Sequence, residues 1–263
     1  MFTQDCVMSM SQSPPQPEDR AADLFFQLSS TDRKRILSEL QKENIHLNGI
    51  AKRLDMTATE TFRQLQRLTE AGLLERLPNG KYRLTLYAKL VLDMSSPLEF
   101  VSKFREHFQH HDTSPIPYEF RARLGELSGG EVTVNTVDMY NRVAEMFTNA
   151  DKRIDATVEG FEYLLNKTLE RLQQGLKVRW LMYESFRTKA KSILRSEKQF
   201  PEMRWTPGIP SVDICLTDKA AAIALTSNKD ISYSIFFGSD PRFLRWTEDM
   251  FTYEWEKAKP WYP

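Results

Sequence analysis

Residues 47–74 read LNGIAKRLDMTATETFRQLQRLTEAGLL, and this stretch decides the fold of the first part of the chain. Its apolar residues recur at the spacing of two short amphipathic helices, 47–54 and 57–71, separated by a tight turn at Asp55-Met56. Thr57 is a predicted N-cap, with Glu60 three residues later as its capping-box partner, and Gly72 is a natural helix stop. The pattern predicts a helix-turn-helix.

The flanking segments predict the rest of a winged helix. Two helices precede the motif, one over 18–29 with Ala22, Phe25, Phe26 and Leu28, and one that begins at Thr31. Two short β-like runs follow, 73–77 and 81–85, joined by Pro78-Asn79-Gly80. Asn-Gly supplies the positive φ angles that a tight hairpin needs. Helices followed by a hairpin of this kind are typical of a winged helix.

The second helix of the motif has an inner and an outer face. Thr61, Leu65 and Leu68 fall on the inner stripe with Ile50 and Leu54, which leaves the outer face for the major groove. Arg63 can reach guanine or phosphate and Gln66 can reach adenine, while basic residues on the wing suit phosphates or the minor groove. Phe62 either touches a thymine methyl or packs against the preceding helix. The candidate DNA-binding residues are Thr57, Thr59, Phe62, Arg63, Gln66, Arg67, Asn79, Lys81 and Arg83.

Charge and composition restrict the class of protein. The 263 residues suggest two domains, and 36 Lys and Arg balance 36 Asp and Glu, which excludes a highly basic coat protein. Residues 31–92 carry 12 basic against 7 acidic side chains, the sign expected of a DNA-binding segment. No apolar run is long enough for a membrane span, and no secretory signal is present. With only Cys6 and Cys215, we expect a reducing, cytoplasmic location.

The remaining chain changes from helical to alternating elements. Residues 1–17 predict a flexible tail, 18–92 the winged helix, 93–130 a helical linker, and 131–263 an α/β domain on a mixed sheet. In the linker we expect a helix near 85–93 and others over 97–110 and 117–127. In the last domain we expect helices over 138–149, 160–174, 185–197 and 241–258, with strands over 153–158, 176–183, 202–206, 211–217, 220–226 and 231–237.

The winged-helix segment, with the run Ala71-Gly72-Leu73-Leu74-Glu75-Arg76 at the entry to the wing, resembles archaeal and bacterial transcription regulators related to the ArsR type. A second, more specific resemblance lies in residues 107–127, HFQHHDTSPIPYEFRARLGEL. This phrase is similar to the one that links the domains of archaeal regulators whose second domain was first described in methanogenesis regulators. The matching residues are His111, Asp112, Ser114, Ile116, Pro117, Phe120, Arg123, Gly125, Glu126 and Leu127.

These resemblances imply a DNA-binding transcription regulator with a C-terminal sensing or dimerising domain. That domain is similar in layout to a phospholipase-D-like half-domain, as in TrmB-type regulators. Phospholipase-D chemistry needs a His-x-Lys pair, and none of the four histidines lies after residue 111. The resemblance therefore implies a non-catalytic domain, and we expect no cofactor and no enzyme activity.

Two further groups of residues allow more than one interpretation: the histidines near residue 110 and the basic and aromatic residues of the predicted strands. His107 and His111 lie one helical turn apart, which suits two metal ligands, but no third ligand is evident. The favoured interpretation is that His111 and Asp112 cap a helix in the linker phrase, with His107 and His110 solvated. The aromatic and basic strand residues Arg179, Tyr183, Arg204 and Trp205 could line an effector pocket, although ordinary sheet packing explains each of them.

The sequence thus predicts a sequence-specific regulator that binds double-stranded DNA as a homodimer, with a possible small-molecule effector and no membrane partner. Two alternatives stay open. One is a winged-helix protein-interaction module of a larger transcription assembly, which would have no need for Lys81 and Arg83 around an Asn-Gly tip. The other is an enzyme in the second domain recruited by the winged helix, against which the missing nucleophile motifs weigh.

Overall fold

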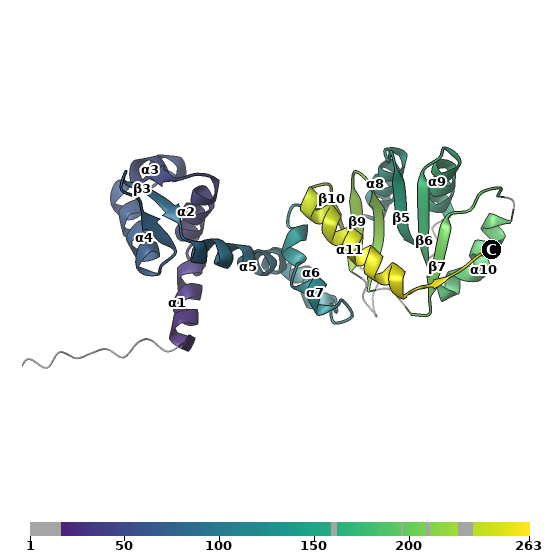
Figure 1. The fold of residues 1–263 in the computed structure, drawn as a ribbon, viewed down its shortest axis with the longest axis horizontal. Coiled ribbons are helices and arrows are strands. Elements are labelled where there is room, and N and C mark those ends of the chain that lie inside the picture. The colour runs from purple at the N-terminus through teal and green to yellow at the C-terminus, as the bar shows by residue number, and fades with distance from the viewer. Residues whose placement is uncertain (1–16, 159–161, 196, 209–210, 226–233) are drawn as a thin grey trace, which may run out of the picture. The chain divides into compact units, whose positions relative to one another are not determined.

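The computed structural model describes residues 17–158, 162–195, 197–208, 211–225 and 234–263, and these form two compact units (Figure 1). Unit 1 ends at Met94 and unit 2 begins at Ser95. Five predictions fall wholly or partly outside the described residues: the flexible tail up to residue 16, the first residues of the helix 160–174, residue 196 of the helix 185–197, and residues 226 and 231–233 of two predicted strands.

Unit 1 is a winged helix-turn-helix, as predicted. Its helices are α1 (Pro17–Ser29), α2 (Thr31–Lys42), α3 (Leu47–Leu54) and α4 (Ala58–Glu70). Its strands are β1 (Ile45–His46), β2 (Leu74–Arg76) and β3 (Lys81–Leu84), which form an antiparallel sheet in the order β1-β3-β2.

The turn between α3 and α4 follows from two residues. Asp55 adopts a left-handed φ of 54°, and its backbone N–H closes α3 on the carbonyl of Ala51. The Thr57 hydroxyl accepts from the backbone N–H of Glu60 at 3.1 Å, so the predicted N-cap is confirmed. The predicted reciprocal bond of a capping box is replaced, because the Glu60 carboxylate binds the side chains of Gln64 and Arg63 instead.

The core of unit 1 uses the predicted inner stripe. Ile50, Leu65 and Leu68 are fully buried, and Thr61 is buried beside them. The buried Arg33 of α2 holds α1 in place, because its Nε donates to the Gln27 carbonyl at 2.8 Å and its Nη2 to the Phe26 carbonyl at 2.6 Å.

The wing turn differs from the predicted one. Gly80 has a φ of 80°, and its N–H donates to the Leu77 carbonyl at 2.9 Å across Pro78 and Asn79. Asn79 itself has no positive φ. The three predicted residues 78–80 therefore connect the strands, but the left-handed φ is confined to Gly80 and does not include Asn79.

The helix after the wing runs through a proline at which the sequence predicted a break. Helix α5 (Leu86–Lys103) continues past Pro97, although proline removes one backbone hydrogen bond there. Aromatic packing beyond the proline favours continuation, because Phe100 is buried and its ring lies 5.0 Å from that of Phe104. Helix α6 (Arg105–His110), helix α7 (Tyr118–Arg121) and the 3-10 helix η1 (Leu124–Leu127) follow, so the predicted helix 117–127 is two short pieces.

Unit 2 contains a mixed sheet of eight strands in the order β11-β7-β6-β5-β8-β9-β10-β4. The parallel pairs are β5 with β6 and β6 with β7, and the other neighbours are antiparallel. The bounds are β4 (Glu131–Thr133), β5 (Arg153–Val158), β6 (Lys177–Tyr183), β7 (Glu202–Thr206), β8 (Val212–Thr217), β9 (Ala221–Leu225), β10 (Ile235–Gly238) and β11 (Lys259–Pro260). Strand β11 was not predicted.

Helices cover both faces of this sheet. One core contains residues of α8 (Thr136–Thr148), α9 (Glu162–Gln173) and α10 (Arg187–Leu194), the last preceded by the 3-10 helix η2 (Glu184–Phe186). The other core contains α11 (Pro241–Lys257) with Phe100, Ile116, Phe120 and Leu127. The α+β fold class, with a winged helix and a mixed-sheet α/β unit, is confirmed.

The phrase 111–127 is built into unit 2. Trp246 of α11 donates from Nε1 to the Phe120 carbonyl at 3.1 Å, and Arg123 joins Glu126 to Asp249 of α11 at 2.9 and 2.7 Å. Gly125 lies so close to α5 that a Cβ there would meet the Pro97 nitrogen at 2.7 Å. The phrase therefore has a packing role on the α11 face of the sheet.

Candidate nucleic-acid interface

The outer face of α4 is open to solvent. Thr59, Phe62, Arg63 and Gln66 are exposed, and the Phe62 ring retains 53% of its accessible surface. Of the two interpretations of Phe62, packing against the preceding helix does not account for a ring this exposed. An exposed aromatic side chain between polar ones leaves this face without a covering element in unit 1.

Two of these polar side chains bind carboxylates of their own helix. Arg63 Nη2 lies 2.6 Å from a Glu60 oxygen, and Gln66 Nε2 donates to Glu70 at 2.9 Å. Hydrogen bonds from Gln64 and then Arg63 lower the pKa of Glu60, so this carboxylate is charged near neutral pH. These contacts hold Arg63 and Gln66 along α4 and engage part of their donors, while the other donors stay open to a ligand.

Arg67 is exposed but lies to one side of this face. Gln64, one turn earlier on α4, accepts from Arg33 of α2 at 3.3 Å, so position 67 lies on the α2 side of α4. Arg67 therefore suits a phosphate at the border of the interface better than a base at its centre.

The wing presents its basic residues on one side. Lys81 and Arg83 alternate along β3 with the buried Tyr82 and Leu84, so both point away from the core. Arg83 Nε pairs with Glu75 of β2 at 2.7 Å. The Asn79 side-chain oxygen accepts from the Lys81 N–H at 3.1 Å, so it shapes the wing tip and leaves only its amide NH2 for a ligand.

Two residues beside the wing tip were not among the predicted ones. A Cβ on Gly80 would lie 3.6 Å from His46 Nδ1 and 3.9 Å from Arg76 Nη2, so both side chains adjoin the tip. Strand register explains their position, because His46 lies opposite Lys81 and Arg76 opposite Tyr82. Sequence reasoning missed His46 because the pairing of residues 45–46 with β3 was not predicted.

The four predicted effector residues do not share one pocket. Arg204 donates to the Trp255 carbonyl of α11 at 3.0 Å, whereas the adjacent Trp205 lies under Arg187 of α10, on the opposite face of the sheet. Consecutive strand residues point to opposite faces, so these two cannot contact one small ligand. Tyr183 binds Asp213 through its hydroxyl.

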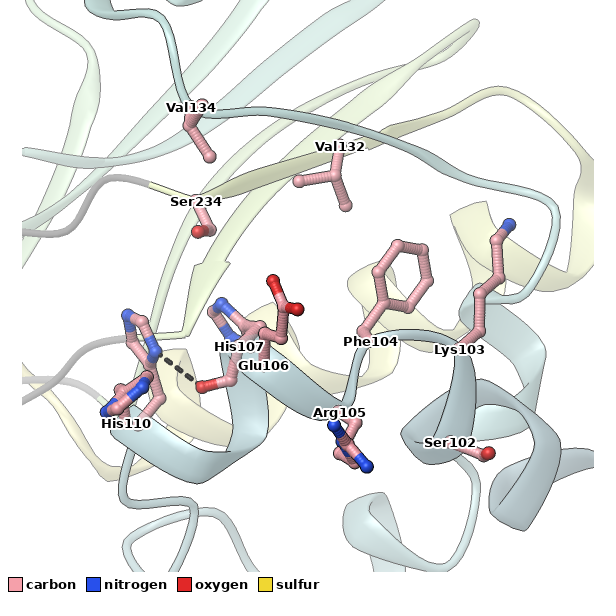
Figure 2. Close-up of a pocket in the computed structure, with 11 residues that line it drawn as sticks. Ser102, Lys103, Phe104, Arg105, Glu106, His107, His110, Val132, Val134 and Ser234 are labelled. Atoms are coloured by element: carbon pink, nitrogen blue, oxygen red, sulfur yellow. Dashed lines mark hydrogen bonds between the residues drawn. The ribbon is translucent and has the colours of Figure 1, made fainter.

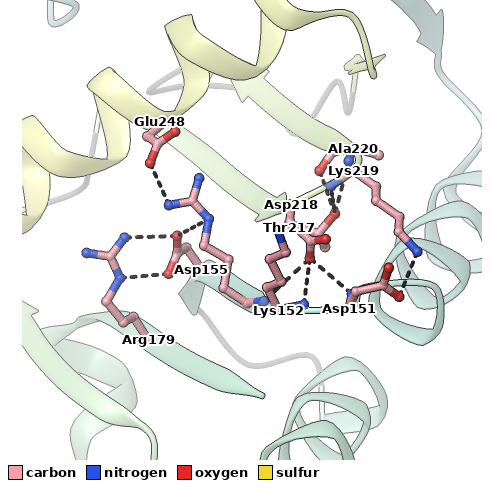
Figure 3. A network of polar contacts seen from close by, with 10 residues as sticks. Asp151, Lys152, Asp155, Arg179, Thr217, Asp218, Lys219, Ala220 and Glu248 are labelled. Carbon is pink, nitrogen blue, oxygen red and sulfur yellow. Dashed lines mark hydrogen bonds and ion pairs between the residues drawn. The ribbon is translucent and has the colours of Figure 1, made fainter.

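Arg179 is held in an internal network (Figure 3). Its Nε and Nη2 donate to the two oxygens of the buried Asp155 at 2.7 and 2.9 Å, and Arg153 lies 3.8 Å from the same carboxylate while pairing with Glu248. An open pocket of about 560 Å³ lies beside Arg179. The guanidinium groups of Arg153 and Arg179 already pair with carboxylates. The network therefore stabilises the fold, and a ligand would have to compete with these pairs.

The histidine cluster matches the favoured interpretation in part, because His111 is the C-cap of α6 and His110 is exposed. The sequence predicts a solvated His107, but its ring nitrogens are buried with no hydrogen-bond partner among the described residues, and its ring stacks on His111 at 3.8 Å. The His111 Nδ1 bonds to the His107 carbonyl, and Asp112 binds Ser114 rather than a helix terminus. Figure 2 shows His107 and Glu106 at an open pocket of about 600 Å³. Among the described residues, no three His, Cys, Asp or Glu side chains gather as metal ligands.

Fold and exposed helix face together define the class as a winged-helix chain with a second, mixed-sheet α/β unit. No protein-family model matches the chain, and no curated protein matches it in sequence. Within the described residues, no helix is both long and apolar enough to cross a membrane.

Several solved structures are similar to the chain. TrmBL2, an archaeal chromatin protein with a novel mode of DNA binding, is 18% identical over 93% of this chain and 99% of its own, with a TM-score of 0.43. NucT from Helicobacter pylori is 12% identical over 50% of this chain and 98% of its own, with a TM-score of 0.42. Nuc from Salmonella typhimurium, a phospholipase D family member, is 10% identical over 51% and 99%, with a TM-score of 0.40. At such scores these likenesses carry no argument about what the chain binds.

Proposed function

We propose that this chain is a sequence-specific, double-stranded-DNA-binding transcription regulator that acts as a homodimer. The observation that carries the proposal is the open outer face of α4, with Phe62, Arg63 and Gln66 exposed next to a hairpin whose outward side chains are basic. An α-helix with such a face fits the major groove, and a basic hairpin fits the adjacent phosphates.

The residue types support DNA over a protein partner. Arg63 offers a bidentate donor for guanine, and Gln66 can bind both edges of adenine. His46, Arg76, Lys81 and Arg83 gather at the wing, where phosphates would be met. A surface that binds protein alone has no need of four basic side chains gathered at a wing.

The test separates base reading from phosphate binding. Arg63→Ala should relax preference at one base position of the operator, since only that contact reads sequence there. Lys81→Ala should weaken binding to all sequences alike and lower the slope of log K against log salt by about 1. Both are measured by titrating selected and random duplexes at several salt concentrations.

Lys42→Ala provides the matched control, because Lys42 is exposed and pairs with Glu39 on α2, outside the proposed interface. It should change neither the preference nor the slope. Binding that stays unchanged in Arg63→Ala and Lys81→Ala would contradict the proposed interface and favour the protein-interaction module.

The homodimer part of the proposal is supported by exposed apolar side chains in unit 1. On α1, Phe25 and Phe26 retain 61% and 59% of their surface, and on α5, Leu86, Leu90 and Met94 retain 84%, 58% and 68%. The three α5 residues recur every fourth position, which aligns them along one side of the helix. Contiguous apolar helix surface of this kind marks an association site, and self-association is the simplest use of it.

A regulator needs no catalytic site, and the unit 2 sheet offers none of the phospholipase-D type, since every histidine of the chain precedes it. A non-catalytic effector or dimerisation role for unit 2 stays a prediction.

A further inference from the structure

Helix α10 and the residues that follow it concentrate positive charge in unit 2. Residues 95–263 carry 23 basic against 24 acidic side chains, yet residues 187–198 carry five basic side chains against the single acidic Glu197. The five are Arg187, Lys189, Lys191, Arg195 and Lys198. This excess is local, so it is not a consequence of the overall charge.

The helix places these charges on one face. Ala190 and Leu194 are buried against the sheet, and the solvent side consists of Thr188, Lys189, Lys191, Ser192 and Arg195. That side carries no acidic and no apolar residue. Lysine, arginine, serine and threonine are the side chains that most often bind phosphate oxygens in protein–DNA complexes.

Two cations on this face, Lys191 and Arg195, are not balanced by an acidic partner among the described residues. In contrast, Lys167 lies 3.1 Å from Glu170, and Lys219 lies 2.7 Å from Asp151. Cations without acidic partners repel one another, which a bound polyanion relieves.

The basic surface continues onto the adjacent sheet edge. The Arg187 guanidinium, which also pairs with Glu184 at 2.7 Å, lies 4.4 Å from the centre of the Trp205 ring, and the Lys259 ammonium lies 5.4 Å from it, so β11 adds the charge of Lys259 to those of α10. The sheet edge and the helix thereby form one cationic surface, which we define as α10 with Lys259.

We propose that this cationic surface is a second DNA contact, which binds the phosphate backbone of duplex DNA without reading its sequence. A membrane surface fits less well, because the exposed face of α10 has no apolar side chain to insert among lipids. The choice of DNA as the polyanion rests on the proposed function of unit 1. The existence of the cationic surface does not depend on that function. Such a contact would add affinity and salt dependence but no base preference.

The experiment uses the full chain and compares two charge-matched double variants. Lys191→Ala with Arg195→Ala removes two exposed cations of α10, and alanine keeps helix propensity high. The slope of log K against log salt should fall by about 1.8, equally for selected and random duplexes, because about two phosphate contacts are lost. Lys167→Ala with Lys219→Ala removes two cations that already pair with acids, and it should leave the slope unchanged.

An unchanged slope in the α10 variant, or the same fall in the control variant, would overturn the inference. Binding to vesicles of phosphatidylserine and phosphatidylcholine that α10 substitution abolishes, with the DNA slope intact, would overturn it in favour of lipid. Arg63→Ala separates this from the proposed function. If base preference depends on Arg63 but the α10 variant leaves the salt slope unchanged, only the second DNA contact is disproved. If the α10 variant lowers the slope but base preference does not depend on Arg63, only the base-reading role of α4 is disproved.

Discussion

Arg63 is the residue proposed to read a base, and a neighbouring carboxylate holds its side chain in place. It pairs with Glu60 one turn earlier on α4, and Gln66 similarly binds Glu70. The interface therefore balances donors against acids on a single helix, which limits non-specific affinity and favours sites that repay the exchange of partners.

Glu60→Gln should raise affinity for duplex DNA about fivefold, because it frees Arg63 and removes a negative charge from the interface. The Thr57 cap persists, since it uses the Glu60 backbone N–H. Affinity is measured by fluorescence anisotropy on a fixed duplex. Glu43→Gln is the control, because Glu43 pairs with Arg53 away from α4 and loses the same charge. An equal rise in both variants would show a general charge effect and contradict the specific release of Arg63.

His107 gives the stability of unit 2 a defined pH dependence. Burial, followed by the neighbouring His111, lowers its pKa from the ordinary 6.5 to about 4. The unfolded chain therefore binds a proton that the folded chain does not between these values. The free energy of unfolding should fall as pH drops from 6.5 towards 4, by no more than about 1.4 kcal/mol per pH unit from this group.

His107→Phe should remove this dependence and preserve or raise stability at pH 7, since Phe removes two unpaired buried nitrogens beside Phe108 and Phe236. Denaturant unfolding at pH 7 and pH 4.5 measures both effects. The exposed His110→Phe is the control, and it should retain the wild-type difference between the two pH values. The His107 explanation is wrong when His107→Phe loses as much stability on acidification as the wild type.

At the scale of elements, α1 and α5 are helices with large apolar side chains exposed to solvent. Phe25 and Phe26 were recognised in the sequence as apolar helix residues, yet the structure leaves both exposed. Helix α5 likewise buries Ala88 and Val91 towards unit 1 and exposes Leu86, Leu90 and Met94. Periodicity shows which residues share a helix face, but it does not show whether a face meets its own chain or another copy.

Leu90→Glu should weaken self-association by at least tenfold, because it places a charge in an apolar dimer seam. In an isolated chain Leu90 is solvent-exposed, so the melting temperature of a dilute sample should change little. Sedimentation equilibrium over a range of concentrations measures the dissociation constant. Lys89→Glu, one residue away and outside the apolar row, is the control. Self-association that is identical in wild type and Leu90→Glu would contradict the seam on α5.

At the scale of the whole molecule, local signals predicted the winged helix well. Thr57, Gly72 and the alternation from Lys81 to Leu84 each act over a few residues, so sequence reasoning reached them. It failed where distant packing decides. Phe100 and its aromatic neighbours accompany the continuation of α5 through Pro97, and Phe236 buries the His107 ring. Arg204 and Trp205 illustrate the same limit, because similar residue types at neighbouring positions serve opposite faces of one sheet.

The central claim, sequence-specific DNA binding, is tested most directly by titrating the purified chain with the DNA upstream of its own gene and with random duplex of equal length, each at two salt concentrations. We predict tighter binding to the upstream DNA at both salt concentrations. As salt rises, the affinity for random duplex should fall by a larger factor than the affinity for the upstream DNA. Failure to bind either duplex at low salt would contradict the account and identify the winged helix as a protein-interaction module.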